Sequence, residues 1–148
     1  MEFVKLIKAC DVEAVKDFPI SFRINETSAG YLGMAHLALG DAPEHIEMTK
    51  YLLSIGADPN EADELGRTPV HMAVLHGHVE CLKLLLDAGG RISKKDKAGF
   101  TARNFLNYLT KAPSTIRRMY KIIERDARKR NRVKSAKPLI KRRKPLKP

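Results

Sequence analysis

Apolar residues recur at intervals of three and four in two stretches of the chain. The first stripe consists of Val79, Leu82, Leu85 and Leu86. The second consists of Ile116, Met119, Tyr120 and Ile123. Such spacing places the apolar side chains on one face of an amphipathic helix. The pattern therefore predicts one helix over Val79–Ala88, which Gly89 ends, and another that has Ser114 as its N-cap.

A shorter helix is predicted just before the first of these. Thr68 can cap its N-terminus, and Pro69 suits the first helical position because no N–H donor is needed there. The helix then covers Pro69–Leu75, and Gly66 and Gly77 on either side suit turns that a Cβ would obstruct. The predicted unit is therefore a turn followed by two antiparallel helices.

This unit recurs with a period of 33 residues. The interval separates four pairs of identical residues: Gly56 and Gly89, Asp63 and Asp96, Gly66 and Gly99, Thr68 and Thr101. A period of this length is typical of stacked helical repeats, which bury their apolar faces against their neighbours and expose one long surface. Since such surfaces bind other macromolecules, the period favours an interaction protein.

The segment Asp63–Ser93 reads DELGRTPVHMAVLHGHVECLKLLLDAGGRIS and closely resembles an ankyrin repeat, with the Thr-Pro-x-His turn at Thr68–His71. The resemblance covers residues 1–124. It implies an all-α ankyrin-repeat solenoid of about four helix-turn-helix repeats joined by short β-hairpins. We expect the repeats at about residues 1–24, 25–60, 61–95 and 96–124.

The other repeats depart from this pattern at identifiable positions. In the second, residues 34–35 are Met-Ala in place of Thr-Pro, and two extra residues fall between its helices, at about Gly40–Glu44. In the first, Cys10 stands where a turn glycine is usual. In the fourth, Ala102 and Asn104 replace the proline and the histidine. The first and last repeats therefore resemble capping repeats.

The chain of 148 residues has the length of one domain, and its net charge of +11 is confined to one end. Residues 1–124 contain 16 Lys and Arg and 16 Asp and Glu, so their charges cancel. Residues 125–148 contain 12 basic residues and one acid, and 12 − 1 = 11 accounts for the whole net charge. Because this basic tail has few apolar residues, we expect it to be partly helical at its start and disordered beyond about Arg132.

The sequence gives no sign of a membrane span or a secretory signal. No apolar run approaches the roughly 20 residues that cross a bilayer, and the first residues are too charged for a signal peptide. Cys10 and Cys81 both fall at helical positions of repeats. We expect both to be reduced, packed thiols in a cytosolic or nuclear protein.

A cluster of potential metal ligands comprises His71, His76, His78 and Cys81. Their spacing matches no zinc pattern, and the repeat accounts for each one separately. The glycines lie singly at repeat turns and form no phosphate-binding loop. We therefore expect no metal, no cofactor and no enzymatic activity.

The resemblance implies a partner-binding concave surface made of hairpin tips and the exposed face of the inner helices. In the third repeat the matching residues are Glu64, Leu65, Arg67, Leu75 and His76. In the fourth they are Lys97, Ala98, Phe100, Tyr108 and Leu109.

The two hairpin tips are expected to differ in charge. One is acidic, with Glu61, Asp63 and Glu64, and the next is basic, with Lys94, Lys95 and Lys97. The alternative is that these charges only solvate the hairpins. We expect a monomer that binds a protein partner as an adaptor or regulator.

The tail contains a further motif. Lys129 and Arg130 precede, by ten residues, a second basic cluster composed of Lys141, Arg142, Arg143 and Lys144. This arrangement resembles a bipartite nuclear localisation signal, which implies a nuclear import receptor as partner and a protein of nucleus and cytoplasm. One alternative is a nucleic-acid-associated protein whose tail binds the phosphate backbone while the repeats recruit a protein. Another is binding of an acidic membrane or of calmodulin by the helix Ser114–Arg132.

Overall fold

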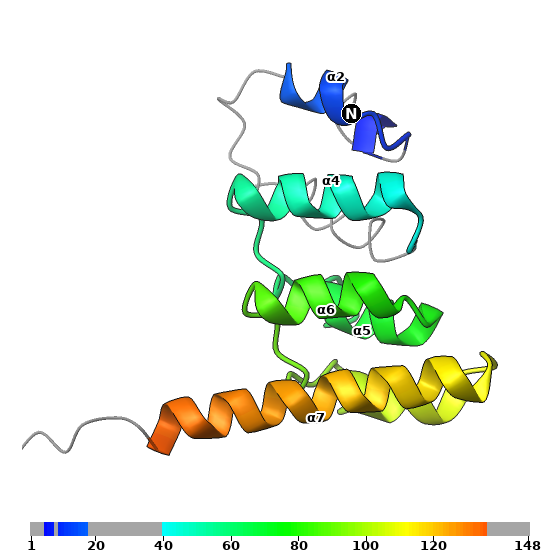
Figure 1. The fold of residues 1–148 in the computed structure, drawn as a ribbon, viewed down its shortest axis with the longest axis vertical. Coiled ribbons are helices and arrows are strands. Elements are labelled where there is room, and N and C mark those ends of the chain that lie inside the picture. Colours follow the sequence, from blue (N-terminus) through cyan, green and yellow to red (C-terminus); the bar gives the residue numbers. More distant parts are fainter. Residues whose placement is uncertain (1–4, 8, 18–39, 136–148) are drawn as a thin grey trace, which may run out of the picture.

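The computed structural model describes residues 5–7, 9–17 and 40–135, and all named elements in this part of the chain are helices. They are α2 (Val12–Lys16), α4 (Pro43–Ser54), α5 (Pro69–His76), α6 (Val79–Asp87), the 3₁₀ helix η1 (Ala102–Tyr108) and α7 (Pro113–Ser135). The helices lie in layers along one axis, from α2 through α4 and the α5–α6 pair to η1 and α7 (Figure 1). The expected all-α repeat fold is confirmed.

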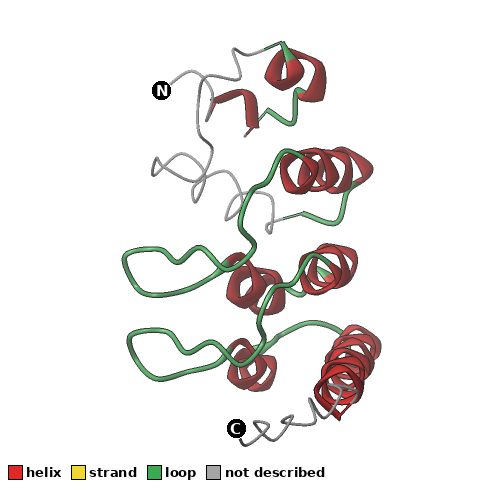
Figure 2. Ribbon diagram, turned by 90° about the vertical axis from the view of Figure 1, so that its left-hand side faces the viewer, coloured by secondary structure: helices red, strands yellow, loops and turns green. Residues whose placement is uncertain are grey.

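The stack has two columns of helices with loops projecting from one side. Seen along the helices, α4, α6 and α7 form one column and α5 and η1 the other (Figure 2). Helix α6 packs against α4, α5 and α7, and α5 packs against η1. The third repeat therefore lies between two neighbours and buries both faces of its helix pair.

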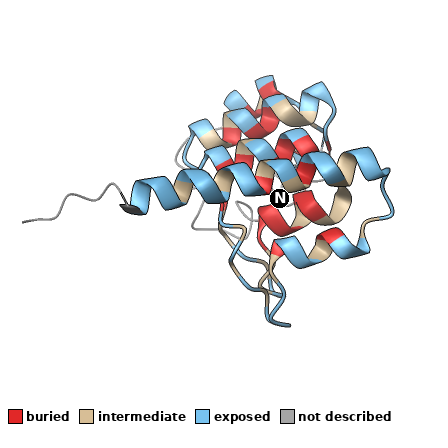
Figure 3. Ribbon diagram, turned by 60° about the horizontal axis from the view of Figure 1, so that its bottom comes forward, coloured by how far each residue is buried: buried red, intermediate tan, exposed pale blue. Residues whose placement is uncertain are grey.

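The core runs continuously between the layers. Its largest fully buried apolar side chains are Ile7, Met48, Leu52, Leu82, Leu85, Met119, Val70 and Val74. They come from every described layer, and buried positions concentrate where neighbouring helices meet (Figure 3). The predicted stripe of α6 is buried throughout, at Val79, Leu82, Leu85 and Leu86. The periodicity of the sequence therefore located the packed face correctly.

Helices end in a left-handed residue that is glycine in the later repeats. Beyond α6, the Gly89 amide donates to the Leu86 carbonyl at 3.1 Å and the Gly90 amide to the Leu85 carbonyl at 2.8 Å, the two bonds of a Schellman motif. In the first repeat Cys10 takes the same role with φ 55°. The turn is therefore kept even where glycine is replaced, although a Cβ is strained in this conformation.

Several predicted boundaries need correction. Helix α7 begins at Pro113, not after an N-cap at Ser114, because the proline occupies the first helical position and the Ala112 carbonyl accepts from Thr115 at 2.9 Å. It continues to Ser135, past the expected limit at Arg132. The inner helix of the fourth repeat is the 3₁₀ helix η1. The inner helix of the second repeat lies outside the described residues.

The predicted β-hairpins are tight turns rather than paired strands in the described part of the chain. Each is closed by two backbone bonds. In the first, the Asp63 amide donates to the Arg67 carbonyl at 2.9 Å and the Gly66 amide to the Asp63 carbonyl at 2.8 Å. In the second, the Asp96 amide donates to the Phe100 carbonyl at 2.8 Å and the Gly99 amide to the Asp96 carbonyl at 3.0 Å. An isolated antiparallel bridge joins Lys95 and Thr101. The carboxylates of Asp63 and Asp96 add side-chain bonds to these backbone bonds.

His71 joins the third repeat to the fourth. The Thr68 amide donates to His71 Nδ1 at 3.1 Å, so that this nitrogen carries no proton, and the Thr68 hydroxyl lies 2.9 Å from it. The proton is therefore on Nε2, which lies 3.3 Å from the Phe100 carbonyl and donates to it. Burial lowers the pKa of His71 and keeps the ring neutral.

Asn104 reproduces half of this arrangement in the fourth repeat. Its Oδ1 accepts from the Thr101 amide at 2.8 Å and from the Thr101 hydroxyl at 2.7 Å. The Asn104 side chain is shorter than that of His71 and has no counterpart of Nε2. It therefore caps its own helix without a bond to a following hairpin. The exchange of histidine for asparagine thus fits a repeat at the end of the stack.

Asp41 caps α6 from the preceding repeat. Its carboxylate accepts from the Val79 amide at 2.8 Å and from the Cys81 amide at 3.1 Å. The insertion predicted at Gly40–Glu44 therefore carries a structural residue, since the N-cap of α6, His78, provides no side-chain bond of its own.

Replacing Leu85 with Ala is expected to lower the free energy of unfolding by about 2–5 kcal/mol, because the side chain is buried between layers and its loss leaves a cavity. Urea denaturation followed by circular dichroism measures the change. Lys83→Ala, an exposed position on the same helix, is the matched control and is expected to stay within about 0.5 kcal/mol of the parent. Equal stability of the Leu85→Ala variant and the parent would contradict the assigned core.

Replacing His71 with Asn is expected to keep the cap on Thr68 but to remove the bond to Phe100, at a cost of about 0.5–1.5 kcal/mol at neutral pH. The variant is also expected to be less sensitive to acid. Because the folded pKa of His71 is lowered, the unfolded state binds more protons, and stability present above about pH 6.5 is lost as the pH falls through the folded pKa.

The measurement is the urea midpoint of parent and variant between about pH 5 and pH 7.5. Burial also lowers the pKa of His76 and His78, so a smaller dependence of the same sign remains in the variant. Parallel curves for the two proteins would show that His71 is not buried as a neutral ring.

Candidate functional site

The two described hairpin tips form one continuous edge of the stack (Figure 2). Within the first tip, Asp63 Oδ1 accepts from the Leu65 amide at 2.9 Å. Within the second, Asp96 Oδ1 accepts from the Phe100 amide at 2.8 Å. The Lys97 amide donates across to the Leu65 carbonyl at 2.9 Å. The two carboxylates therefore fix the tips, and a backbone bond sets the spacing between them.

Gly66 permits this close approach. It has φ +77°, and a Cβ placed on it would lie 2.8 Å from the Lys97 amide nitrogen. Gly99 occupies the same place in the next tip, with φ +85° and no atom within 4 Å of its notional Cβ among the described contacts. The first glycine is thus required both by its backbone angle and by its neighbour.

The residues predicted from the resemblance differ in how far they reach solvent. The exposed ones are Glu64, Leu65, Lys97, Ala98, Phe100 and Tyr108. The half-buried ones are Arg67, Leu75, His76 and Leu109. We call the two groups together the hairpin surface. Three of its large apolar side chains are strongly exposed, Leu65 at 55%, Phe100 at 43% and Tyr108 at 68%.

Arg67 holds the first tip together. Its Nε and Nη2 both lie 2.9 Å from Asp63 Oδ2, and the Asp63 side chain is nearly buried. The ion pair offsets the charge of Asp63, so the expected acidic tip rests on Glu61 and Glu64. Burial raises the pKa of Glu61, and the nearby Asp58 adds to this effect.

Phe100 occupies the position of Arg67 in the next tip, 33 residues later. A phenyl ring cannot pair with Asp96, and the ring instead lies 6.4 Å from that of Phe105 while nearly half of the side chain stays in solvent. The last described tip therefore lacks the ion pair of its neighbour and presents an aromatic side chain in its place.

The predicted basic tip is only partly available to a partner. Lys94 Nζ donates to the Asn60 carbonyl at 2.6 Å and so ties the tip to the preceding repeat. Lys95 and Lys97 remain exposed. Burial lowers the pKa of His76, and the positive charges of Lys111 and Arg67 lower it further, so this side chain is neutral at pH 7.

The two parts of the proposed nuclear signal differ in position. Lys129 and Arg130 lie within α7; Lys129 Nζ is 3.7 Å from Asp87, and Arg130 pairs with Asp126 at 2.7 Å and donates to the Gly90 carbonyl. The first basic pair is thus helical and contacts α6. The second cluster, residues 141–144, lies outside the described residues.

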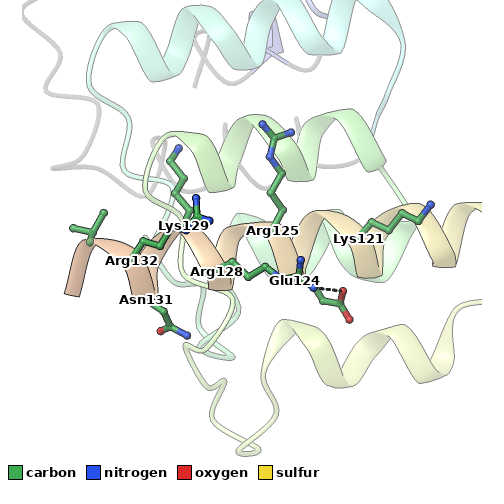
Figure 4. A pocket seen from close by; sticks show the side chains of 8 residues that line it. Lys121, Glu124, Arg125, Arg128, Lys129, Asn131 and Arg132 are labelled. Carbon is green, nitrogen blue, oxygen red and sulfur yellow. Dashed lines mark ion pairs between the residues drawn. The ribbon is translucent and has the colours of Figure 1, made fainter. Parts of the chain in front are cut away.

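The sequence suggested the helix that is now α7 as a binder of an acidic membrane or of calmodulin, but it did not identify which side chains form its basic surface. Figure 4 shows its side chains, which line one open depression: Lys121, Glu124, Arg125, Arg128, Lys129, Asn131, Arg132 and Val133. All come from one helix, so they form an exposed face rather than an enclosed cleft. The spacing of Lys121, Arg125 and Arg128 is the signal that would have revealed it.

The described residues contain no group of three or more side chains placed to hold a metal ion. Burial raises the pKa of Cys81 to about 12, so this thiol stays protonated and unreactive. None of the helices in the described ranges is long and apolar enough to cross a bilayer.

Known proteins match this chain through its repeats. Residues 35–86 match the family model for ankyrin repeats (many copies). A fem-1 homologue of Drosophila melanogaster is 40% identical over 80 residues, which are 53% of this chain and 11% of that protein. The human transient receptor potential cation channel subfamily A member 1 is 32% identical over 90 residues, 61% of this chain and 8% of the channel.

An ankyrin repeat-containing protein of Schizosaccharomyces pombe is 49% identical over 49 residues, 33% of this chain and 24% of that protein. The chain thus spans a minor part of each relative. The matched residues include the Thr-Pro-x-His turn, α5 and most of α6, whose stacking and hydrogen bonds are described above. Residues 35–86 therefore carry ankyrin repeats.

Proposed function

We propose that this protein is a non-enzymatic adaptor or regulator that binds a protein partner on the hairpin surface. The observation that carries the proposal is Phe100, an exposed aromatic side chain where the preceding repeat has an arginine in an internal ion pair. Leu65 and Tyr108 add exposed apolar area. Aromatic anchors surrounded by polar residues are typical of protein interfaces.

The proposal includes the finer organisation expected from the sequence. Residues 1–124 form the ankyrin-repeat solenoid, and residues 125–148 form the basic tail, which begins inside α7. The hairpin tips are fixed by backbone bonds and by the contact of His71 with Phe100, which supports rigid presentation of the anchor side chains. A preorganised surface loses little conformational entropy on binding.

We further propose that the tail directs nuclear import through Lys141, Arg142, Arg143 and Lys144. Import receptors bind extended basic segments, and Lys129 and Arg130 are helical and in contact with α6. The second cluster is therefore the better candidate for the signal. On this proposal the protein occurs in nucleus and cytoplasm.

Replacing Phe100 with Arg is expected to weaken partner binding at least about tenfold, or about 1.4 kcal/mol, without loss of stability. The new arginine can pair with Asp96 as Arg67 pairs with Asp63, so the fold is retained while the exposed ring is removed. The partner is first captured from cells by the full chain and identified. The affinity of the purified pair is then measured by calorimetry.

Ile55→Arg is the matched control, because Ile55 is exposed to nearly the same extent, 44%, and lies at the end of α4. It is expected to bind normally. The proposal fails if every captured protein binds the parent and the Phe100→Arg variant equally well.

Changing Lys141, Arg142, Arg143 and Lys144 together to Gln is expected to move a fluorescent fusion out of the nucleus. The fusion carrier must be too large to diffuse through nuclear pores. A variant with Lys129 and Arg130 changed to Gln is expected to show a smaller effect, since these side chains contact Asp87, Asp126 and Gly90. A parent fusion that stays in the cytoplasm would refute the import proposal.

A further inference from the structure

Four cations follow one face of α7, and we call them the cation stripe: Lys121, Arg125, Arg128 and Arg132. Their intervals of four, three and four residues return to the same side of a helix that turns every 3.6 residues. All four side chains are exposed. They therefore form a straight row about 16 Å long, from eleven residues at 1.5 Å each.

Lys121, Arg128 and Arg132 lie on the side of α7 away from the repeats, whereas Arg125 also lines a groove with Leu86 and Asp87 of α6. The opposite face of α7 carries Met119 and Ile123, which are buried, and then Asp126 and Arg130, which contact each other and the end of α6. These four residues also recur at intervals of four, three and four. The packing of α7 thus uses one side of the helix and leaves most of the cation stripe on the other.

Nearby acids offset little of this charge. Helix α7 contains nine basic residues and two acidic ones, a net charge of 9 − 2 = +7. Lys121 and Arg125 form no ion pair with any described residue, and Arg128 lies 4.0 Å from Glu124, with both side chains largely in solvent. An exposed pair at this distance contributes little, so Lys121, Arg125 and Arg128 keep most of their charge for a partner.

The chemistry of this face favours a polyanion over an apolar partner. From Lys121 to Lys134 the exposed apolar side chains are Ala127 and Val133. Helices that bind membrane surfaces or calmodulin need a broad face of large apolar side chains, and the large apolar residues of α7 up to Ile123 are buried or half-buried in the stack. What remains for a partner to bind is a row of charges.

A nucleic-acid duplex supplies the matching row of phosphates. Its charge density is one per about 1.7 Å of axis, so that roughly ten phosphates lie along the length of the stripe. The C-terminal half of α7 projects beyond the layers above it (Figure 1), which leaves room for a rigid rod to lie against it. The exposed face has no aromatic side chain on which single-stranded bases could stack.

We infer that the cation stripe of α7 binds the phosphate backbone of double-stranded DNA, independently of base sequence. This surface is separate from the hairpin surface and from the cluster at residues 141–144. The cations contact phosphates and not base edges, so they fix position without sequence preference. A protein partner on the hairpins and a duplex on α7 can then be held by one chain.

The test uses the full chain and fluorescence anisotropy with two short DNA duplexes of unrelated sequence, between about 50 and 200 mM salt. One variant changes Lys121, Arg125, Arg128 and Arg132 to Gln. The matched control changes four exposed lysines outside α7 to Gln: Lys50, Lys95, Lys97 and Lys111. A third variant changes Lys141, Arg142, Arg143 and Lys144 to Gln. Circular dichroism verifies the helicity of each protein.

The stripe variant is expected to lose at least about 100-fold in affinity for both duplexes. Its slope of log affinity against log salt is expected to fall by about 3.6, or 0.9 for each of four phosphate contacts. The control variant is expected to change the slope by less than about 0.9, which is the contribution of one phosphate contact. The tail variant is expected to retain the part of the slope that the stripe provides.

Three results would overturn the inference. The first is equal loss of affinity in the stripe and control variants, which would mean that only net charge matters. The second is loss of binding in the tail variant together with normal binding in the stripe variant. The third is stripe-dependent binding to vesicles of phosphatidylcholine and phosphatidylserine in the absence of stripe-dependent binding to DNA, which would identify a membrane surface as the partner.

Discussion

The neutral ring of His71 is the contact on which the described hairpin surface depends. Its Nδ1 accepts from Thr68 and thereby starts α5, while its Nε2 donates to the Phe100 carbonyl in the next repeat. A charged ring has two donors and cannot accept from the Thr68 amide, so burial of the neutral form is a condition of both bonds. One side chain thus connects the start of a helix, the stacking of repeats and the position of the exposed Phe100.

The two described hairpin tips differ in their roles: one is held by internal contacts, and the other exposes a side chain for binding. In the tip of the third repeat, Arg67 pairs with Asp63, and Gly66 lets the tip of the fourth repeat approach closely. In the following repeat, Phe100 and Asn104 take the places of Arg67 and His71. The first change removes an ion pair within the tip, and the second removes a bond to a following hairpin. The fourth repeat therefore lacks both bonds, and the exposed ring of Phe100 is the basis of the proposed partner site.

Much of the fold follows from short-range patterns. The period of 33 residues, the Thr-Pro-x-His turn and the stripe from Val79 to Leu86 predicted the repeat, its helices and its buried face. Contacts between repeats were harder to predict, because they join residues far apart in sequence. The cap that Asp41 provides for α6 and the contact of Arg130 with Gly90 depend on stacking geometry. Exposure of Leu65, Phe100 and Tyr108 was expected from the resemblance, whereas the ion pair of Arg67 was not, since only a folded turn places it beside Asp63.

Amide hydrogen exchange at Lys97 tests the central claim most directly, because this amide donates to the Leu65 carbonyl between the two tips. If His71 holds the tips together, the Lys97 amide is protected in the parent and exchanges much faster in the His71→Asn variant, while the amide of Leu85 inside α6 keeps its protection. Exchange of Lys97 at the rate of an open loop in the parent, or equal protection in both proteins, would contradict the account.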